Sequence, residues 1–153
     1  MAHPTPIDDS YPSCVRTNAS LLVYTKSSSP DVVTERLGHQ PTSIHYKGQR
    51  IRNSYGRERQ TNTNLWALSS HGRVESMDLR RHINWVTSQV LPVARELKAL
   101  LAEADMRALI SCNWWSRTGL GGPLLSPDQM RAIADLELEC GLDVMFMEGD
   151  DAL

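Results

Sequence analysis

Apolar residues along this chain fall into short runs typical of strands, separated by runs with helical spacing, and one such unit occurs twice. In both copies an apolar run is followed by Ser-Pro-Asp, a short helical pattern, a glycine and a second apolar run. The first copy comprises 20–26, Ser29-Pro30-Asp31 and 43–47, and the second comprises 107–115, Ser126-Pro127-Asp128 and 142–146. Serine before a proline and an acidic residue is typical of a helix N-terminus. Each copy therefore predicts a strand, a helix and a strand.

Two further elements lie between the copies. Residues 64–70 predict a third strand, and 78–102 predict a long helix, because apolar residues recur there at steps of three and four. Pro92 lies inside that helix and is expected to bend or break it near Val90. The predicted class is α+β with the order β-α-β-β-α-β-α-β. Its first six elements match a ferredoxin-like split βαβ sheet, which carries its helices on one face and leaves the other open.

Length and composition indicate one ordinary soluble domain. The chain has 153 residues, of which 41% are hydrophobic and 22% charged, and a net charge of −2, which argues against a dedicated nucleic-acid or membrane-surface protein. Its three cysteines lack CxxC spacing, which favours a reducing compartment. We find neither a long apolar stretch nor a secretory signal, so we expect no membrane association and a cytoplasmic location.

The expected domain organisation has three parts. Residues 1–18 carry Pro4, Pro6 and Pro12 among polar residues and are expected to form a flexible N-terminal arm. Residues 19–148 are expected to form the single α+β domain, and 149–153 an acidic tail.

Several short segments, in order along the chain, together resemble a known family. They are Ser29-Pro30, Leu37 to Thr42, Lys47-Gly48 and Leu65 to Ser70, followed by the long helix, a polar-aromatic strand and the second Ser-Pro helix. In this set the chain resembles the uncharacterised bacterial family called domain of unknown function 4279, over roughly residues 18–147. The resemblance implies an α+β domain from a bacterium, and it implies no established activity or catalytic residues.

A basic segment follows the first copy. Between residues 47 and 59, five basic residues face one acid, Glu58, and two tyrosines lie beside them. The candidate binding residues are Arg50, Arg52, Tyr55, Arg57 and Arg59. Conversely, residues 132–153 contain seven acids and no Lys or Arg. Three interpretations are open: a solvated loop or one paired with the protein's own acids, a surface for a protein partner or a second copy, and a grip on nucleic-acid phosphates.

The tryptophans divide between two faces of the sheet. Trp66, Trp85 and Trp114 are expected in the core, so Trp115, one residue after Trp114, must point to the opposite face. There it is a candidate binding residue together with Asn113, Ser111 and either His45 or Thr25. The alternative is that Trp115 packs under the N-terminal arm or the glycine-rich segment 117–125.

No motif in the chain predicts catalysis. The histidines lack metal-ligand spacing, Cys112 is expected to be a buried structural thiol, Cys140 lies where a helix C-terminus would disfavour a thiolate, and 117–125 lacks the ending of a P-loop. We therefore predict no catalytic residue, no metal and no cofactor. An enzyme whose site assembles from distant residues stays open.

These observations favour a cytoplasmic, non-enzymatic binding module whose partner is a protein or a second copy of the chain. Immunity proteins, which neutralise a toxin, are one class of this kind by analogy alone. The alternative is a nucleic-acid or nucleotide-binding module that uses the basic segment 47–59.

Overall fold

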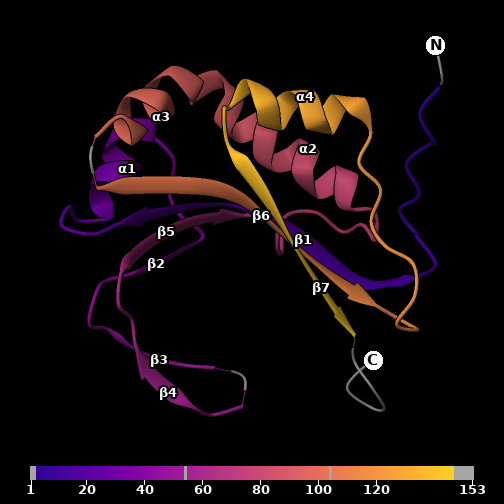
Figure 1. The fold of residues 1–153 in the computed structure, drawn as a ribbon, viewed down its shortest axis with the longest axis horizontal. Coiled ribbons are helices and arrows are strands. Elements are labelled where there is room, and N and C mark those ends of the chain that lie inside the picture. Colours follow the sequence, from indigo (N-terminus) through magenta and orange to yellow (C-terminus); the bar gives the residue numbers. More distant parts are fainter. Residues whose placement is uncertain (1–2, 54, 104, 147–153) are drawn as a thin grey trace.

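The computed structural model describes residues 3–53, 55–103 and 105–146, and Figure 1 shows its arrangement. Helices, strands and one 3-10 turn follow one another along the chain. In order they are β1 (Cys14–Thr25), α1 (Asp31–Leu37), β2 (Ser43–His45), β3 (Arg50–Arg52), β4 (Glu58–Gln60), β5 (Asn64–Ser69), α2 (Leu79–Val90), η1 (Leu91–Val93), α3 (Ala94–Leu101), β6 (Met106–Ser116), α4 (Pro127–Asp135) and β7 (Glu139–Phe146).

Five of these strands form the main sheet, in the order β2-β5-β1-β6-β7. Neighbouring strands are antiparallel except for β6 and β7, which run parallel. Strands β1 and β2 therefore run in the same direction with β5 between them, which is the split β-α-β arrangement. The helices lie on one side of this sheet (Figure 1). The predicted α+β class is confirmed, and so is the break before Pro92, where α2 ends at Val90.

The core lies between the sheet and the helices. Alternate residues of each central strand point toward the helices, as the pleat requires, and they are fully buried: Ala19, Leu21 and Val23 on β1 are representative. Trp66 on β5 is buried as well, and its indole N–H donates to Thr34 Oγ1 on α1 at 2.9 Å. The prediction that Trp66 and Trp114 belong to the core is confirmed, while Trp85 packs against the core from a partly buried position.

The N-terminal part differs from the expectation. Strand β1 begins at Cys14, whereas the apolar pattern predicted a strand only from residue 20, so residues 14–18 belong to the central strand and not to an arm. Thr17 and Asn18 are buried there although they are polar, since Thr17 donates its hydroxyl hydrogen bond to the Asn113 carbonyl at 2.8 Å. The expected acidic tail, 149–153, lies outside the described residues.

A buried ion pair fastens the segment before β1 to the helices. The side chains of Asp78 and Arg80 are only 1% and 2% exposed, and Arg80 Nη2 donates to Asp78 Oδ2 at 2.6 Å. The guanidinium also donates to the carbonyls of Thr5 (2.6 Å) and Pro6 (3.0 Å) and to Ser126 Oγ (3.0 Å). One side chain thereby joins the N-terminal segment, the start of α2 and the start of α4.

Three consecutive basic residues, Arg80, Arg81 and His82, would by themselves indicate a solvated basic face, and the structure shows otherwise. Arg80 and His82 are buried, and Arg81 alone points outward, where its Nε lies 3.1 Å from Asp9 Oδ1. Burial raises the pKa of Asp78, but the hydrogen bonds from Arg80 outweigh it and hold the pKa below its usual range. Asp78 therefore stays ionised inside the protein.

Candidate functional site

The helix-free face of the sheet carries a ladder of paired side chains on β1 and β6. The antiparallel register sets five residues of one strand directly opposite five of the other, and all ten point away from the helices. The pairs are Arg16–Trp115, Asn18–Asn113, Ser20–Ser111, Leu22–Leu109 and Tyr24–Arg107. We call these ten residues the β1–β6 ladder.

Each end of the β1–β6 ladder is an arginine stacked on an aromatic ring. The Arg16 guanidinium carbon lies 4.0 Å from the centroid of the Trp115 ring, and that of Arg107 lies 5.3 Å from the Tyr24 ring. A stacked guanidinium keeps the N–H donors at its edge available for a further acceptor. Within the described residues, neither Arg16 nor Arg107 has a carboxylate within ion-pair distance.

Between the two stacked pairs, the β1–β6 ladder has two polar pairs, of asparagine and of serine, and one pair of leucines. Asn113 Nδ2 donates to Asn18 Oδ1 at 3.0 Å, so the two amides are locked together across the strands. Trp115 and Asn113 thus lie where they were predicted, side by side on one face. His45 and Thr25 were the alternative fourth candidates. The prediction for Thr25 is wrong, because its side chain lies on the helix-facing side of β1 and is fully buried.

His45 belongs to the other end of the same face. On β2, His45 lies opposite Leu65 of β5. Leu65 in turn lies opposite Tyr24 of β1, which pairs with Arg107 of β6. Arg107 and Trp115 are separated along β6 by roughly 26 Å at the usual rise of a strand. The predicted residues therefore mark two ends of one long face and do not form a single compact pocket.

The basic segment forms a hairpin, whereas no strand was expected in it. Strands β3 and β4 pair with Ile51 opposite Arg59. Asn53 Oδ1 accepts hydrogen bonds from the backbone N–H of Tyr55 (3.0 Å) and of Arg57 (2.9 Å), and Gly56 adopts a positive φ of 77°. These turn contacts hold the hairpin together in place of a hydrophobic face.

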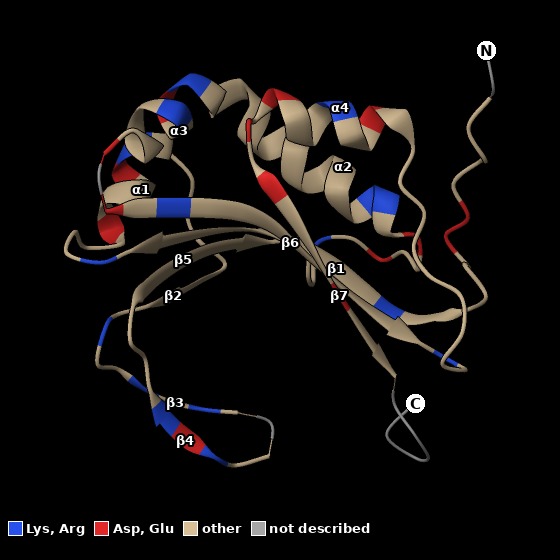
Figure 2. Ribbon diagram, in the orientation of Figure 1, with Lys and Arg blue, Asp and Glu red and all other residues tan. Residues whose placement is uncertain are grey.

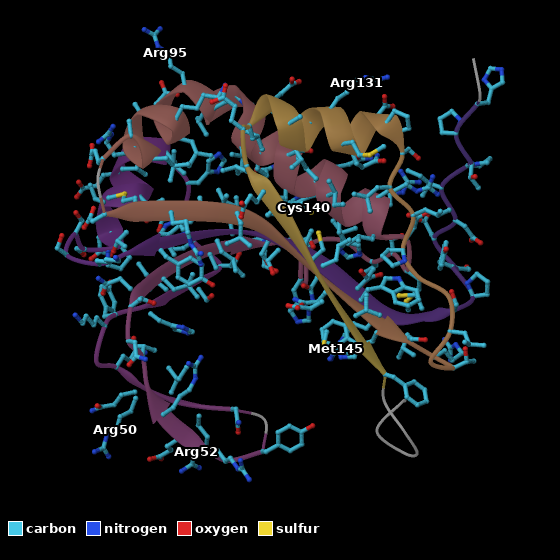
Figure 3. All side chains as sticks on the ribbon, in the orientation of Figure 1. Arg50, Arg52, Arg95, Arg131, Cys140 and Met145 are labelled. Carbon is cyan, nitrogen blue, oxygen red and sulfur yellow. The ribbon has the colours of Figure 1, made fainter. Side chains whose placement is uncertain are left out.

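The hairpin projects from the sheet on the side opposite the helices (Figure 1), and Figure 2 shows its concentration of basic residues. Arg50 and Arg52 point outward from it (Figure 3). Arg52 pairs with Glu58 at 2.9 Å on the surface, whereas Arg50, Arg57 and Arg59 enter no ion pair among the described residues. Nor does any ion pair within that part of the chain join the hairpin to the acidic residues after position 132. These three guanidinium groups therefore carry positive charge that no carboxylate of the described residues pairs with.

Two hollows connect the hairpin with the Tyr24 end of the ladder. One, of about 310 Å³, lies between the hairpin and the sheet and is lined by Arg59, His45 and Tyr24 among others. The second, of about 570 Å³, shares Tyr24 and adds Lys26 and Arg107. This end of the face is therefore both concave and basic.

One acid, Asp105, lines the larger hollow, but it is engaged by the protein itself. Hydrogen bonds from the hydroxyl and backbone N–H of Ser27 and from the N–H of Ser28 lower the pKa of Asp105 to about 2. The ionised carboxylate closes the turn after β1, and among the described residues it forms no ion pair with Arg107, which lines the same hollow.

A buried pair of Ser70 and His82 serves the structure. His82 Nε2 lies 2.8 Å from the Ser76 carbonyl, which can only accept, so Nε2 carries the proton and Nδ1 accepts from Ser70 Oγ at 2.8 Å. The same Ser70 oxygen accepts from the Ala19 N–H at 2.9 Å. Burial lowers the pKa of His82. The imidazole is therefore neutral and fully bonded, and it links α2 to β1.

The cysteines match the expectation in one position and depart from it in another. Cys112 is fully buried, as predicted, and its sulfur lies 3.9 Å from that of Cys140. The hydrogen bond from Cys112 lowers the pKa of Cys140 to about 7, although we expected neither thiol to be activated. The difference arises because Cys140 lies in β7 beside Cys112 and not at a helix C-terminus.

Residues 3–146, apart from positions 54 and 104, contain neither a metal-binding cluster nor a membrane-spanning helix. No group of three or more His, Cys, Asp or Glu residues in this part of the chain is arranged to hold a metal ion. No helix there is long and apolar enough to cross a bilayer.

Of the four residues in the two stacked pairs, the sequence had identified Trp115 alone and missed Arg16, Tyr24 and Arg107. Arg16 was assigned to the arm, and the other two carried no signal beyond their alternation within a strand. Only the pairing of β1 with β6 shows that each arginine lies opposite an aromatic ring.

Comparison with known proteins identifies the family. Residues 15–147, which include the whole β1–β6 ladder and the hairpin, match the family model described as "Domain of unknown function (DUF4279)". No curated protein and no solved structure matches the chain. The protein is therefore a member of the DUF4279 family.

Proposed function

We propose that this protein is a non-enzymatic binding module that holds another protein against the helix-free face of its sheet. The observation that carries the proposal is the β1–β6 ladder, which no helix covers and which has at each end an arginine stacked on an aromatic ring. Tryptophan, tyrosine and arginine are the residues most enriched at the energetic centres of protein interfaces. The adjacent hairpin adds basic charge that the described residues do not neutralise.

The partner is expected to present an acidic surface. Arg59, Lys26 and Arg107 surround the hollows at the Tyr24 end, and Arg50 and Arg57 extend the positive charge along the hairpin. Opposite charge on a partner would speed its encounter with this end, while the Trp115 end would supply buried contact area. A cytoplasmic setting and an inhibitory role like that of an immunity protein belong to this proposal as well.

A protein fits this face better than a nucleic acid does. Base stacking needs a free aromatic face, and both rings of the β1–β6 ladder are already covered by an arginine on one side. In addition, Asp143 on β7 lies beside Asn113 on the same face of the sheet, where it would repel phosphates. Nucleic-acid binding is thus the alternative outcome of the test below.

Removing charge from the hairpin is expected to slow association with the partner. In Arg50→Gln/Arg59→Gln, the association rate should fall by about tenfold at low salt, with little change in dissociation, because these exposed charges steer the encounter. The measurement is stopped-flow or surface-plasmon kinetics against the partner purified from the source cells. Arg95→Gln/Arg131→Gln removes the same charge from the helical side (Figure 3) and should leave the rate unchanged.

Equal rates for both double variants would contradict the proposed role of the hairpin. A single-stranded RNA oligomer serves as the second probe. Tight, salt-dependent RNA binding that is lost in Arg50→Gln/Arg59→Gln, with no protein partner bound to the face, would replace our proposal with the nucleic-acid alternative.

A further inference from the structure

Strand β7 leaves the main sheet with one long open edge. The sheet ends in β2 on one side and β7 on the other, and β2 has three residues whereas β7 has eight. Among the described residues β7 pairs with β6 alone, so its second row of backbone N–H and C=O groups has no strand beside it. A very short edge strand offers too few backbone groups to pair with another chain, whereas an edge of eight residues is a template for a further strand.

The same strand exposes an apolar stripe. Leu142, Val144 and Phe146 are 48%, 57% and 51% exposed. The register places them beside Cys112, Trp114 and Ser116, on the side of the sheet that carries the helices. They extend beyond the area that the helices cover. Strands in parallel pairs are normally buried on both faces, so an exposed apolar stripe on β7 is unusual for a strand that has no further partner.

The glycine-rich segment lies against one end of the stripe. Gly119, in the glycine-rich segment, approaches the Phe146 ring so closely that a Cβ there would lie 3.6 Å from it. The neighbouring Leu120 and Leu124 are exposed, and so is Met130 on α4. Among the described residues, the three side chains of the stripe make up a third of the nine large hydrophobic side chains that are exposed. Apolar patches rimmed by polar residues mark association sites.

We infer that β7 pairs antiparallel with β7 of a second copy, across a two-fold axis perpendicular to the sheet. Such an axis keeps the faces of the two sheets aligned, so the apolar stripe of one copy meets the apolar stripe of the other. Centred on Leu142 or on Val144, the pairing also sets Asp143 opposite a neutral residue, Gly141 or Met145 of the second copy. The edge is therefore complementary to itself in both hydrophobicity and charge.

This association has a consequence for the helix-free face. Two five-stranded sheets become one continuous sheet with both β1–β6 ladders on the same side. A partner with two matching surfaces would then be bound twice by one dimer. The dimer itself depends on β7 alone and not on whether the ladder binds a protein.

Sedimentation equilibrium of the full chain, from micromolar to submillimolar concentration, tests the inference. We expect a reversible dimer. Val144→Lys should be monomeric with an unchanged circular dichroism spectrum and Tm, because the side chain is exposed in the single copy and, in either register, its charge would be placed within the apolar stripe of the interface. The matched control is Leu91→Lys, an exposed apolar position on η1, which should dimerise like the parent.

Two results would overturn the inference: a parent protein that stays monomeric throughout this range, or a dimer that survives Val144→Lys. Disulfide cross-linking in a Cys140→Ser background tests the register of the β7–β7 pairing. Mild oxidation should link two copies through Val144→Cys or through Leu142→Cys, according to which residue lies on the axis. A dimer that forms neither cross-link places the interface elsewhere and likewise excludes the β7 pairing.

Discussion

Replacement of Arg80 by methionine is expected to lower the free energy of unfolding by about 3–5 kcal/mol, because it leaves the Asp78 carboxylate buried without its counter-charge. Methionine fills much of the same volume but donates no hydrogen bond. The substitution also leaves the carbonyls of Thr5 and Pro6 without the guanidinium that now binds them. Urea denaturation followed by circular dichroism measures the loss, which we expect with little change in m-value.

Two control variants separate the causes. Arg81→Met removes the neighbouring arginine, whose ion pair with Asp9 is exposed, and should change stability little. Asp78→Asn/Arg80→Met removes both buried charges and keeps a good N-cap, so it should recover a large part of the loss. If Arg80→Met and Arg81→Met proved equally mild, the buried pair would not be what fastens the N-terminal segment.

Trp115→Ala is expected to weaken partner binding by about 2 kcal/mol, a factor of about 30. The substitution removes the largest side chain of the β1–β6 ladder and deprives Arg16 of the ring on which it stacks. Because Trp115 is on the helix-free face and outside the core, the fold should persist. Titration calorimetry with the partner measures the effect, and a circular dichroism spectrum checks the fold.

Trp115→Phe is the matched variant. It retains an aromatic ring for Arg16 and should keep a substantial part of the affinity. Unchanged affinity in Trp115→Ala would show that this end of the β1–β6 ladder makes no energetic contribution to binding, and the interface would then have to be sought at the hairpin or at β7.

Local signals in the sequence predicted the helices and most strands. Ser126 precedes α4 as its N-cap, as the Ser-Pro-Asp motif predicted, and the Gln129 side chain accepts from the Ser126 N–H at 2.9 Å. Gly38 ends α1 with a φ of 69°, as a left-handed C-cap requires. Alternation within β6 sufficed to place Trp115 opposite to Trp114. Each of these features depends on residues fewer than five positions apart.

The features that could not be predicted depend on residues far apart in the chain. Residues 80–82 are charged or polar, which locally indicates a solvated face, yet Arg80 is buried by partners near both the N-terminus and α4. Likewise, Arg16 is paired with Trp115 only through the register of β1 and β6. The hairpin lacks apolar alternation and depends on the turn contacts of Asn53, so no periodicity could reveal it.

Hydroxyl-radical footprinting of the protein, alone and with its partner bound, tests the central claim most directly. We expect protection of Trp115, Tyr24 and Met145, which point away from the helices, and unchanged oxidation of Trp85 and Met130 on the helical side. The β7 dimer would be present in both samples and would not alter the comparison. Protection of Trp85 and Met130 with no change at Trp115 and Tyr24 would contradict the account, because the partner would then bind the helices and not the open sheet.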